Sequence, residues 1–366
     1  MSYSWQSIVD VIFFLSVPAV LSAKTDALKL VDWRPESQMV VKETKILKPK
    51  FPVIDIHNHL GELENTKKYL EEMDEAGVWK CVSLDARSAG NFYREHLRVS
   101  KSFSKDRFLL FFKPDFSKID EPDFGHKEAR KLEGAANMGI RGMKIAKSLG
   151  LTLKDKSGRL VPVDDPRIDP LWSKCGELGI PVVIHVSDPK AFFTPLDRFN
   201  ERYEELCAHP DWSFYGAQYP SKEEILAQRN RVFAKHPNTI FIGAHMGTLP
   251  EELHIVAMWL DCYPNFYVDI AARISDLGRQ PYTARRFLIK YQDRVLFGTD
   301  LPPNAEVYRN YYRFLETDDE YFEPYGDQGR WMIYGIHLSD EVLEKIYNKN
   351  AQKIFGRLSI SEEICK

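Results

Sequence analysis

A unit made of a short apolar strand, a loop and a helix recurs from Phe51 onward, and this alternation constrains the fold more than any other feature of the sequence. Eight candidate strands begin near Phe51 (FPVIDIH), Val78 (VWKCVSL), Arg107 (RFLLFFK), Ile140 (IRGMKI), Pro181 (PVVIH), Thr239 (TIFIGAH), Asn265 (NFYVDI) and Arg294 (RVLFG). They are rich in β-branched and aromatic residues and hydrophobic on both faces, which is typical of buried parallel strands.

Helical patterns separate the candidate strands. They cover Thr66–Ala76, Lys127–Met138, Lys222–Lys235, Glu251–Cys262 and Thr283–Tyr291. Gly77 and Gly139 directly follow two of them, as glycines that end helices do. A last helical pattern, Asp340–Gly356, is predicted to pack against the outside of the fold.

Eight strand and helix units predict an α/β protein with a (β/α)₈ TIM barrel, a fold that takes about 250 residues and can exceed 400 with insertions. The competing fold, an open doubly wound sheet, usually has fewer strands and often carries a glycine-rich loop after its first strand. Here the first strand ends in histidines. We expect enlarged loops after strands 4, 5 and 8 (Ala146–Pro166, Val186–Pro220 and Leu301–Leu338), at the face where active sites of barrels are built.

The first 50 residues lie outside this pattern. Val11 to Ala23 is an apolar run of 13 residues, too short for a membrane span of about 20 residues. Residues 1–23 are predicted to be a signal peptide or an N-terminal helix, 24–50 an arm, 51–357 the barrel and 358–366 a C-terminal tail. A cleaved signal peptide predicts an exported or periplasmic protein, and otherwise a cytoplasmic one.

Composition excludes several classes of function. Lys and Arg number 50 against 53 Asp and Glu, so the net charge of -3 gives no reason to expect nucleic acid or an anionic membrane as partner. We expect a small-molecule substrate and no stable membrane insertion. The five cysteines form no CxxC pair, so neither a cysteine zinc site nor a disulfide framework is indicated.

The strongest local motif is Asp55-Ile-His57-Asn-His59 at the end of the first strand. Because side chains alternate along a strand, Asp55, His57 and His59 are predicted to share the inner face. Ile54 and Ile56 are then predicted to face the helices. Two polar imidazoles are unfavourable inside an apolar core unless a common partner binds them, and a divalent metal such as zinc is such a partner.

Other strand ends carry the same kind of residue. The fifth strand closes with His185, the sixth with His245 and the eighth with Asp300, which follows Gly298 and Thr299. Because strand ends of a barrel meet at one face, we expect these side chains to gather there with the first-strand histidines.

These motifs resemble those of the amidohydrolase superfamily, and of the amidohydrolase-related branch that includes aminocarboxymuconate-semialdehyde decarboxylase. The resemblance runs from about Phe51 to Gly356 and includes the closing stretch Asn350-Ala351 with Ile354-Phe355-Gly356. It implies a distorted (β/α)₈ barrel and a divalent metal, usually zinc, with one ion per chain or two. Related barrels often form homodimers.

The resemblance also implies roles for the gathered residues. His57, His59 and His185 would bind the metal, and Asp300 would be a further ligand that accepts a proton from water. His245 would act as a catalytic residue beside the water or bind a second ion. Asp55 and Asp269 would support the ligands through hydrogen bonds.

Positive groups near the strand ends are the candidates for substrate binding. Arg273 could clamp a substrate carboxylate, and Lys113 ends the third strand. Lys144, at the end of the fourth strand, has three possible roles. It contacts the substrate or supports the ligands, it is a solvated charge, or, as the resemblance to binuclear members implies, it is carboxylated and bridges two metals. Its neighbour Lys147 leaves open which lysine faces inward.

Two reactions fit this set of residues. The first is metal-dependent hydrolysis of an amide, lactone or ester in a small carboxylated molecule. The alternative is a metal-dependent decarboxylase or hydratase acting on a similar acid. A barrel that binds metal without catalysis is a third hypothesis, against which the presence of all five residues argues.

Overall fold

The structure is a computed structural model that describes residue 29, residues 32–33, 35–61, 65–103, 106–326 and 328–356. It divides into two units, Met1–Val40 and Val41–Lys366. The predictions for residues 1–23 and 358–366 lie outside the described residues. Within the second unit, the segment from Val41 to Lys50 contains no helix or strand, and Lys42 forms an ion pair of 2.7 Å with Asp318.

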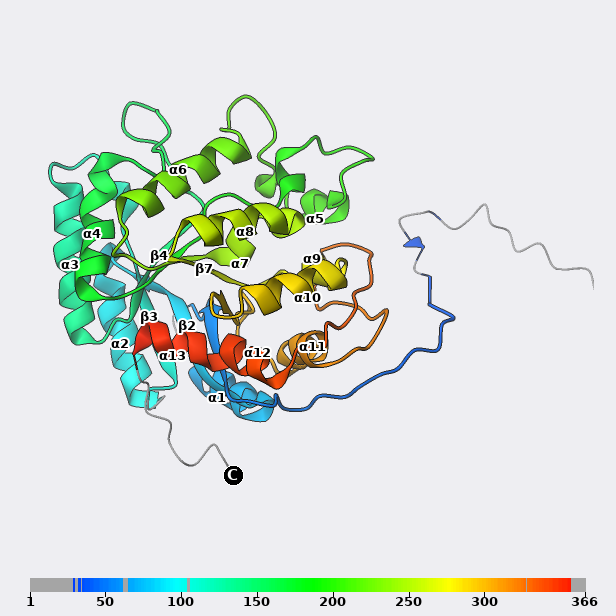
Figure 1. The fold of residues 1–366 in the computed structure, drawn as a ribbon. Helices are drawn as coiled ribbons and strands as arrows, with labels where there is room; N and C mark the ends of the chain where they lie inside the picture. The colour runs from blue at the N-terminus through cyan, green and yellow to red at the C-terminus, as the bar shows by residue number, and fades with distance from the viewer. Residues whose placement is uncertain are drawn as a thin grey trace, which may run out of the picture. The chain divides into compact units, whose positions relative to one another are not determined.

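Eight parallel strands form one sheet in sequence order, as the alternating pattern predicts (Figure 1). They are β1 (Val53–Asn58), β2 (Val78–Arg87), β3 (Phe108–Lys113), β4 (Gly142–Ile145), β5 (Val182–Ile184), β6 (Phe241–Gly243), β7 (Phe266–Asp269) and β8 (Val295–Leu296). Two backbone hydrogen bonds join the last strand region to the first, from Ile56 N to Phe297 O (3.0 Å) and from Asp300 N to His57 O (2.8 Å). The sheet is therefore a nearly closed (β/α)₈ barrel.

Helices surround the strands (Figure 1). They are α1 (Thr66–Ala76), α2 (Phe92–Phe103), α3 (Phe124–Met138), α4 (Asp169–Leu178), α5 (Tyr203–Ala208), α6 (Lys222–Lys235), α7 (Ala244–Gly247), α8 (Leu253–Cys262), α9 (Ile274–Gly278), α10 (Pro281–Lys290), α11 (Ala305–Glu316), α12 (Asp340–Glu344) and α13 (Asn350–Phe355), with one π-helical turn, η9 (Lys345–Lys349). Gly77 and Gly139 end α1 and α3 in the left-handed conformation, which confirms their predicted capping role.

Strand side chains divide between two apolar clusters. The larger one joins strand residues such as Val53 and Val182 to the helices. The smaller one fills the barrel interior and contains Ile54, Ile56, Trp79, Val82, Leu84, Leu109, Phe111, Val183, Ile242, Ala244, Tyr267 and Leu296. The strands thus place one row of apolar side chains inside the barrel and one row under the helices.

The predicted faces of the first strand are wrong for three residues. Ile54 and Ile56 lie inside the barrel, whereas Asp55 accepts a hydrogen bond of 3.0 Å from the Tyr308 hydroxyl of α11, outside it. The cause is an irregularity in the pairing with β2, whose register shifts between Asp55 and Asn58. Simple alternation fails there, and His57 turns inward as well.

The last helices close the end of the barrel where the strands begin. Asn348 donates to Pro52 O at the start of β1, and Asn350 donates to Val295 O in β8 (both 2.7 Å). Ala351 and Ile354 join the interior cluster. The predicted packing against the outside is therefore correct for the first half of this segment only, since Val342 and Ile346 belong to the outer cluster.

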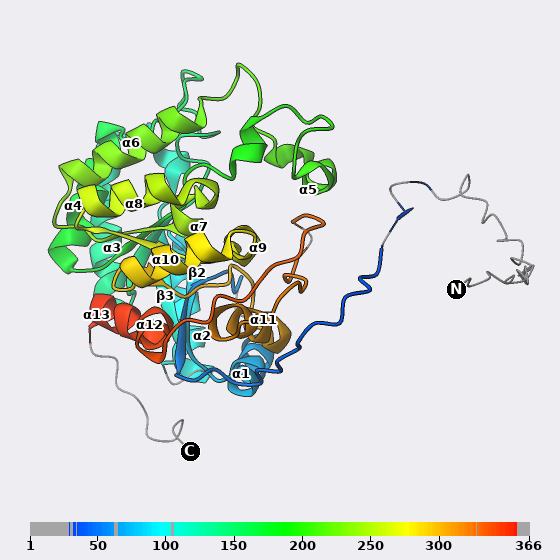
Figure 2. The same ribbon diagram turned by 45° about the vertical axis from the view of Figure 1, so that its right-hand side comes forward.

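The segment after β8 differs from the prediction of a plain loop. Within Leu301–Leu338 the chain forms α11, whose apolar face carries Tyr308, Tyr311 and Tyr312. This helix lies beside α1 and completes the ring of helices (Figure 2). No helix among the described residues has both the length and the apolar character that a membrane span requires.

Candidate functional site

Five residues from four strand ends meet at one end of the barrel. His57 lies within β1 and His59 directly after it, while His185 follows β5, His245 follows β6 and Asp300 follows β8. The parallel strands bring these distant positions to the same face, as in other barrels. Four of the five side chains lie close together and the fifth, His185, is oriented differently.

Asp300 is the centre of the group. Its Oδ1 atom lies 3.1 Å from Nε2 of His57 and 3.5 Å from Nε2 of His59, and its Oδ2 atom lies 3.7 Å from Nε2 of His245. Burial opposes ionisation of Asp300, but the electrostatic interactions of the carboxylate with the His57 and His245 rings outweigh burial and hold the pKa of the carboxyl well below its usual value.

The other nitrogen of each of these three imidazoles has an acceptor. Nδ1 of His57 lies 2.8 Å from Asp269, Nδ1 of His59 lies 2.9 Å from Asp85, and Nδ1 of His245 lies 2.7 Å from the carbonyl oxygen of Ala271. Each acceptor favours a proton on Nδ1, so the Nε2 atoms of the neutral rings keep a lone pair that faces Asp300.

His245 lies in a strained turn. His245 and Met246 have φ angles of 58° and 59°, values that cost L-residues roughly 1–2 kcal/mol each. The turn is secured by a hydrogen bond of 2.8 Å from the His245 amide to Asp269. Nε2 of His245 is buried without a hydrogen-bond partner among the described residues, and burial holds the pKa of the ring well below its usual value.

His185 lies beside this group, but its Nε2 atom faces elsewhere. The ring centroids of His185 and His245 are 4.5 Å apart. Nε2 of His185 lies 3.4 Å from Asp188, whose other oxygen accepts a hydrogen bond of 2.8 Å from Lys147. Burial lowers the pKa of His185 to about 4, so the ring is neutral near pH 7.

Lys144 faces the barrel interior, whereas Lys147 pairs with Asp188. The ammonium group of Lys144 lies 3.2 Å from Nε2 of His57 and the side chain is buried. Burial lowers the pKa of Lys144 to about 8, although Asp300 and Asp269 raise it. This contact places one positive charge next to the histidines.

The donor set fits a divalent cation. Nε2 of His57 and a carboxylate oxygen of Asp300 lie 3.1 Å apart, and in the neutral ring both atoms offer lone pairs to a cation. Two sets of donor atoms lie within 4.8 Å of one another, His57, His59 and Asp300 in one and His57, His245 and Asp269 in the other. Neutral imidazole and carboxylate are ligands that zinc and manganese accept.

Two further cations border the site. Arg273 is buried and donates a hydrogen bond to Ala272 O (2.6 Å). Burial is the main cause of the lowered pKa of His245, and the charge of Arg273 lowers this pKa further. Its Nε atom has no hydrogen-bond partner among the described residues. Lys113 ends β3 and its charge acts on Lys144 and on Asp85. Both positions suit recognition of an anionic substrate group.

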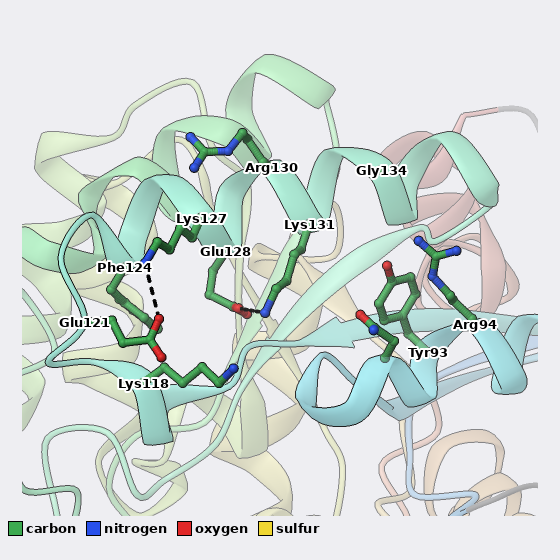
Figure 3. Close-up of a pocket in the computed structure, with 11 residues that line it drawn as sticks. Tyr93, Arg94, Lys118, Glu121, Phe124, Lys127, Glu128, Arg130, Lys131 and Gly134 are labelled. Carbon is green, nitrogen blue, oxygen red and sulfur yellow. Dashed lines mark hydrogen bonds and ion pairs between the residues drawn. The ribbon is translucent and has the colours of Figure 1, made fainter.

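A hollow of about 590 Å³ on the flank of the barrel is separate from these residues. It lies between α3 and the first turn of α2, and both of its carboxylates are paired, Glu121 with Lys127 and Glu128 with Lys131 (Figure 3). None of the predicted site residues lines it.

Asp85 and Asp188 are missing from the sequence-based prediction. Asp85 follows the apolar run VWKCVSL of the second strand, much as Asp300 follows the run of the eighth, and this signal could have been used. Asp188 comes three residues after His185, in a loop whose course the sequence does not indicate. Both bind a histidine of the site.

Solved structures with similar folds are distant in sequence. The 2,6-dihydroxybenzoate decarboxylase from Rhizobium matches with a TM-score of 0.51 and 18% identity over 83% of this chain and 98% of that chain. A dihydroxybenzoic acid decarboxylase from a Polaromonas species, solved with manganese and 2-nitroresorcinol, matches with a TM-score of 0.53 and 17% identity over 83% and 96%. The 4-oxalomesaconate hydratase from Rhodopseudomonas palustris matches with 0.50 and 14% over 83% and 96%.

Sequence comparison identifies the family. A comparison with curated protein sequences finds no match. The sequence profile described as amidohydrolase matches residues 118–357, more than half of the chain and the part that carries His185, His245 and Asp300. Together with the barrel, this match shows that the chain belongs to the amidohydrolase family of metal-dependent enzymes.

Proposed function

We propose that this protein is a metal-dependent hydrolase that cleaves an amide, lactone or ester bond in a small, carboxylated molecule. The observation that carries the proposal is the arrangement around Asp300. Nε2 atoms of His57 and His59 converge on one of its oxygens, and the unpartnered Nε2 of His245 lies 3.7 Å from the other.

The metal would be held by His57, His59, His185 and Asp300. His185 would exchange its contact with Asp188 for the metal. When bound, a divalent metal lowers the pKa of a water molecule and polarises a carbonyl group. We propose zinc and one ion per chain, with Lys144, 3.2 Å from Nε2 of His57, as a contact for the substrate.

His245 would move the proton. Its Nδ1 atom donates to Ala271 O, so Nε2 is an acceptor in the neutral ring and can take a proton from the attacking water. The protonated ring can then pass the proton to the leaving group. Asp300 would orient the same water and take part in removing its proton.

Arg273 and Lys144 would bind the carboxylate of the substrate, with Lys113 further out. A buried guanidinium and a buried ammonium group both gain from an anion that enters a site from which water is excluded. These cations favour a substrate that carries a carboxylate.

Decarboxylation is the second candidate. Two of the solved structures with this fold are decarboxylases of hydroxybenzoates. The buried ammonium of Lys144 supports it here, because a cation inside the barrel can stabilise the negative charge that develops when a carboxylate leaves as carbon dioxide. The two reactions use the same metal ligands and differ in whether water ends up in the product.

Labelled water separates the two reactions. Metal-loaded protein is offered a panel of carboxylated lactones, amides and esters, and a panel of hydroxybenzoates, in water enriched in oxygen-18. Hydrolysis predicts one labelled oxygen in the product, no carbon dioxide, and loss of activity in His245→Ala but not in His254→Ala, an imidazole on α8. Release of unlabelled product with carbon dioxide would contradict the hydrolase and support the decarboxylase.

A further inference from the structure

Helix α6 contributes two buried cations that have no carboxylate partner. Lys222 is 4% exposed and Arg229 is 1% exposed. Within the part of the chain that the structure describes, neither forms an ion pair. Lys222 donates mainly to backbone carbonyl groups, whereas Arg229 donates to the carbonyl of Gly247 and to the side-chain oxygen of its neighbour Asn230. Burial of an unpaired charge costs free energy, so the question is what the hydrogen bonds of these two side chains hold in place.

Lys222 connects two strand ends. Its ammonium group donates to the carbonyl oxygen of Asp188, after β5, and to that of Thr248, after β6, the latter at 2.5 Å. The Thr248 hydroxyl adds a hydrogen bond of 3.1 Å to Val186 O between the same two segments. A single side chain therefore joins the loop that follows His185 to the turn that follows His245.

Arg229 binds the same turn. Its Nη1 atom donates to Gly247 O at 2.8 Å. The guanidinium stacks in an aromatic cage, 4.3 Å from the ring centre of Trp259 and 5.3 Å from those of Phe233 and Phe266. Glycine suits position 247 because of its φ of +64°, and because a Cβ atom there would lie only 3.2 Å from Phe266, while its distance of 3.5 Å to Arg229 would be an ordinary contact.

The turn needs such support. Four consecutive residues, His245 to Thr248, have φ angles between 58° and 64°, and three of them carry side chains. The left-handed conformation is unfavourable for each of the three L-residues, so their strain adds up along the turn. Donors on the carbonyl groups of Gly247 and Thr248 stabilise this conformation where no regular helix continues.

We propose that Lys222 and Arg229 are positioning residues that hold the turn after β6 against the loop after β5, and so keep His245 beside His185. The ring centroids of these histidines are 4.5 Å apart. The inference rests on the proposed function for the roles of His185 as metal ligand and His245 as proton acceptor. Neither cation contacts the reacting atoms.

Cobalt binding tests the proposal without a substrate. Metal-free protein is titrated with Co²⁺, and the visible spectrum reports the geometry of the ligands. Lys222→Met is expected to weaken Co²⁺ binding by about tenfold or more and to change the spectrum, because contacts that orient metal ligands are worth about 10- to 100-fold in affinity. Lys222→Arg, which restores charge and donors, is expected to recover most of the affinity. Arg229→Lys is expected to show a smaller loss.

The control is Lys235→Met on the same helix, whose side chain is 58% exposed and pairs with Asp169. It should bind Co²⁺ like the wild type. If Lys222→Met does not fold, Lys222→Gln, which keeps a neutral donor, takes its place with the same criteria. A folded Lys222 variant with wild-type affinity and spectrum overturns the inference alone, whereas a wild-type protein that binds no metal overturns the proposed function with it.

Discussion

Nδ1 of His57 lies 2.8 Å from Oδ2 of Asp269, and both side chains are fully buried. The same carboxylate also accepts from the His245 amide through Oδ1, at 2.8 Å. Asp269 therefore orients two histidines of the site from a third strand, and it fixes on which nitrogen of His57 the proton resides.

Removal of the Asp269 charge should weaken metal binding. In Asp269→Asn the amide is a poorer acceptor for both histidines, and we expect the affinity for Co²⁺ to fall by about 10- to 100-fold in a calorimetric titration. Asp261→Asn, an exposed change on α8, is the control. Equal affinities of Asp269→Asn and wild type would show that Asp269 does not act on the metal ligands.

Gly298 should be required for the position of His57. A Cβ atom at residue 298 would lie 2.9 Å from Cβ of His57 and 3.3 Å from Cβ of Ala271. Gly298→Ala is therefore expected to lower the free energy of unfolding by about 1–3 kcal/mol and to reduce the metal content. Gly134→Ala, on α3 with nothing within 4 Å of the new atom, should raise stability slightly in the same denaturation experiment.

The Tyr308 hydroxyl should stabilise the fold through Asp55. It donates a hydrogen bond of 3.0 Å to a carboxylate that is wholly buried and that also accepts from Thr299 at 2.7 Å. Tyr308→Phe is expected to cost about 1–3 kcal/mol of unfolding free energy, measured with urea. Tyr282→Phe, whose ring is 80% exposed, should cost nearly nothing. Equal costs for the two variants would refute this role.

Lys222 should give the protein a characteristic stability profile at alkaline pH. Burial lowers the pKa of Lys222 from 10.5 to about 8 in the folded chain. Between these values the unfolded chain holds a proton that the folded chain has released, so the free energy of unfolding rises with pH. From pH 7 to pH 10.5, the free energy of unfolding of the wild type should therefore rise relative to that of Lys222→Met by about 3 kcal/mol.

The exposed Lys67 is the comparison for that profile, since its side chain is 92% exposed. Lys67→Met and wild type should keep parallel stability curves over the same pH range. A Lys222→Met curve that also runs parallel to wild type would show that burial does not alter the titration of this lysine.

The sequence predicted the strands well, since each is a compact apolar run between turns. The positions of His57, His185, His245 and Asp300 at strand ends followed from the runs that precede them. The sequence did not predict which side chains of β1 face the barrel interior. The register shift after Asp55 arises from the pairing with β2 and cannot be recognised in the local alternation of apolar and polar residues.

Contacts between segments that are distant in the sequence could not be predicted either. The pairing of His59 with Asp85 depends on how β1 lies against β2. The helix α11 lies in the segment after β8, for which the sequence predicts an enlarged loop. The roles of Lys222 and Arg229 could not be predicted, because a lysine and an arginine on an amphipathic helix are normally solvent-exposed. Their burial depends on the turn after β6, which the helix covers.

Metal content per chain tests the central claim most directly. Purified protein, freed of metal and reconstituted with zinc, is analysed by elemental mass spectrometry beside His57→Ala and the exposed control His254→Ala. We expect close to one tightly held ion per chain in wild type and in His254→Ala, and almost none in a folded His57→Ala. Wild-type protein that retains no ion, or His57→Ala that retains as much as wild type, would contradict the account.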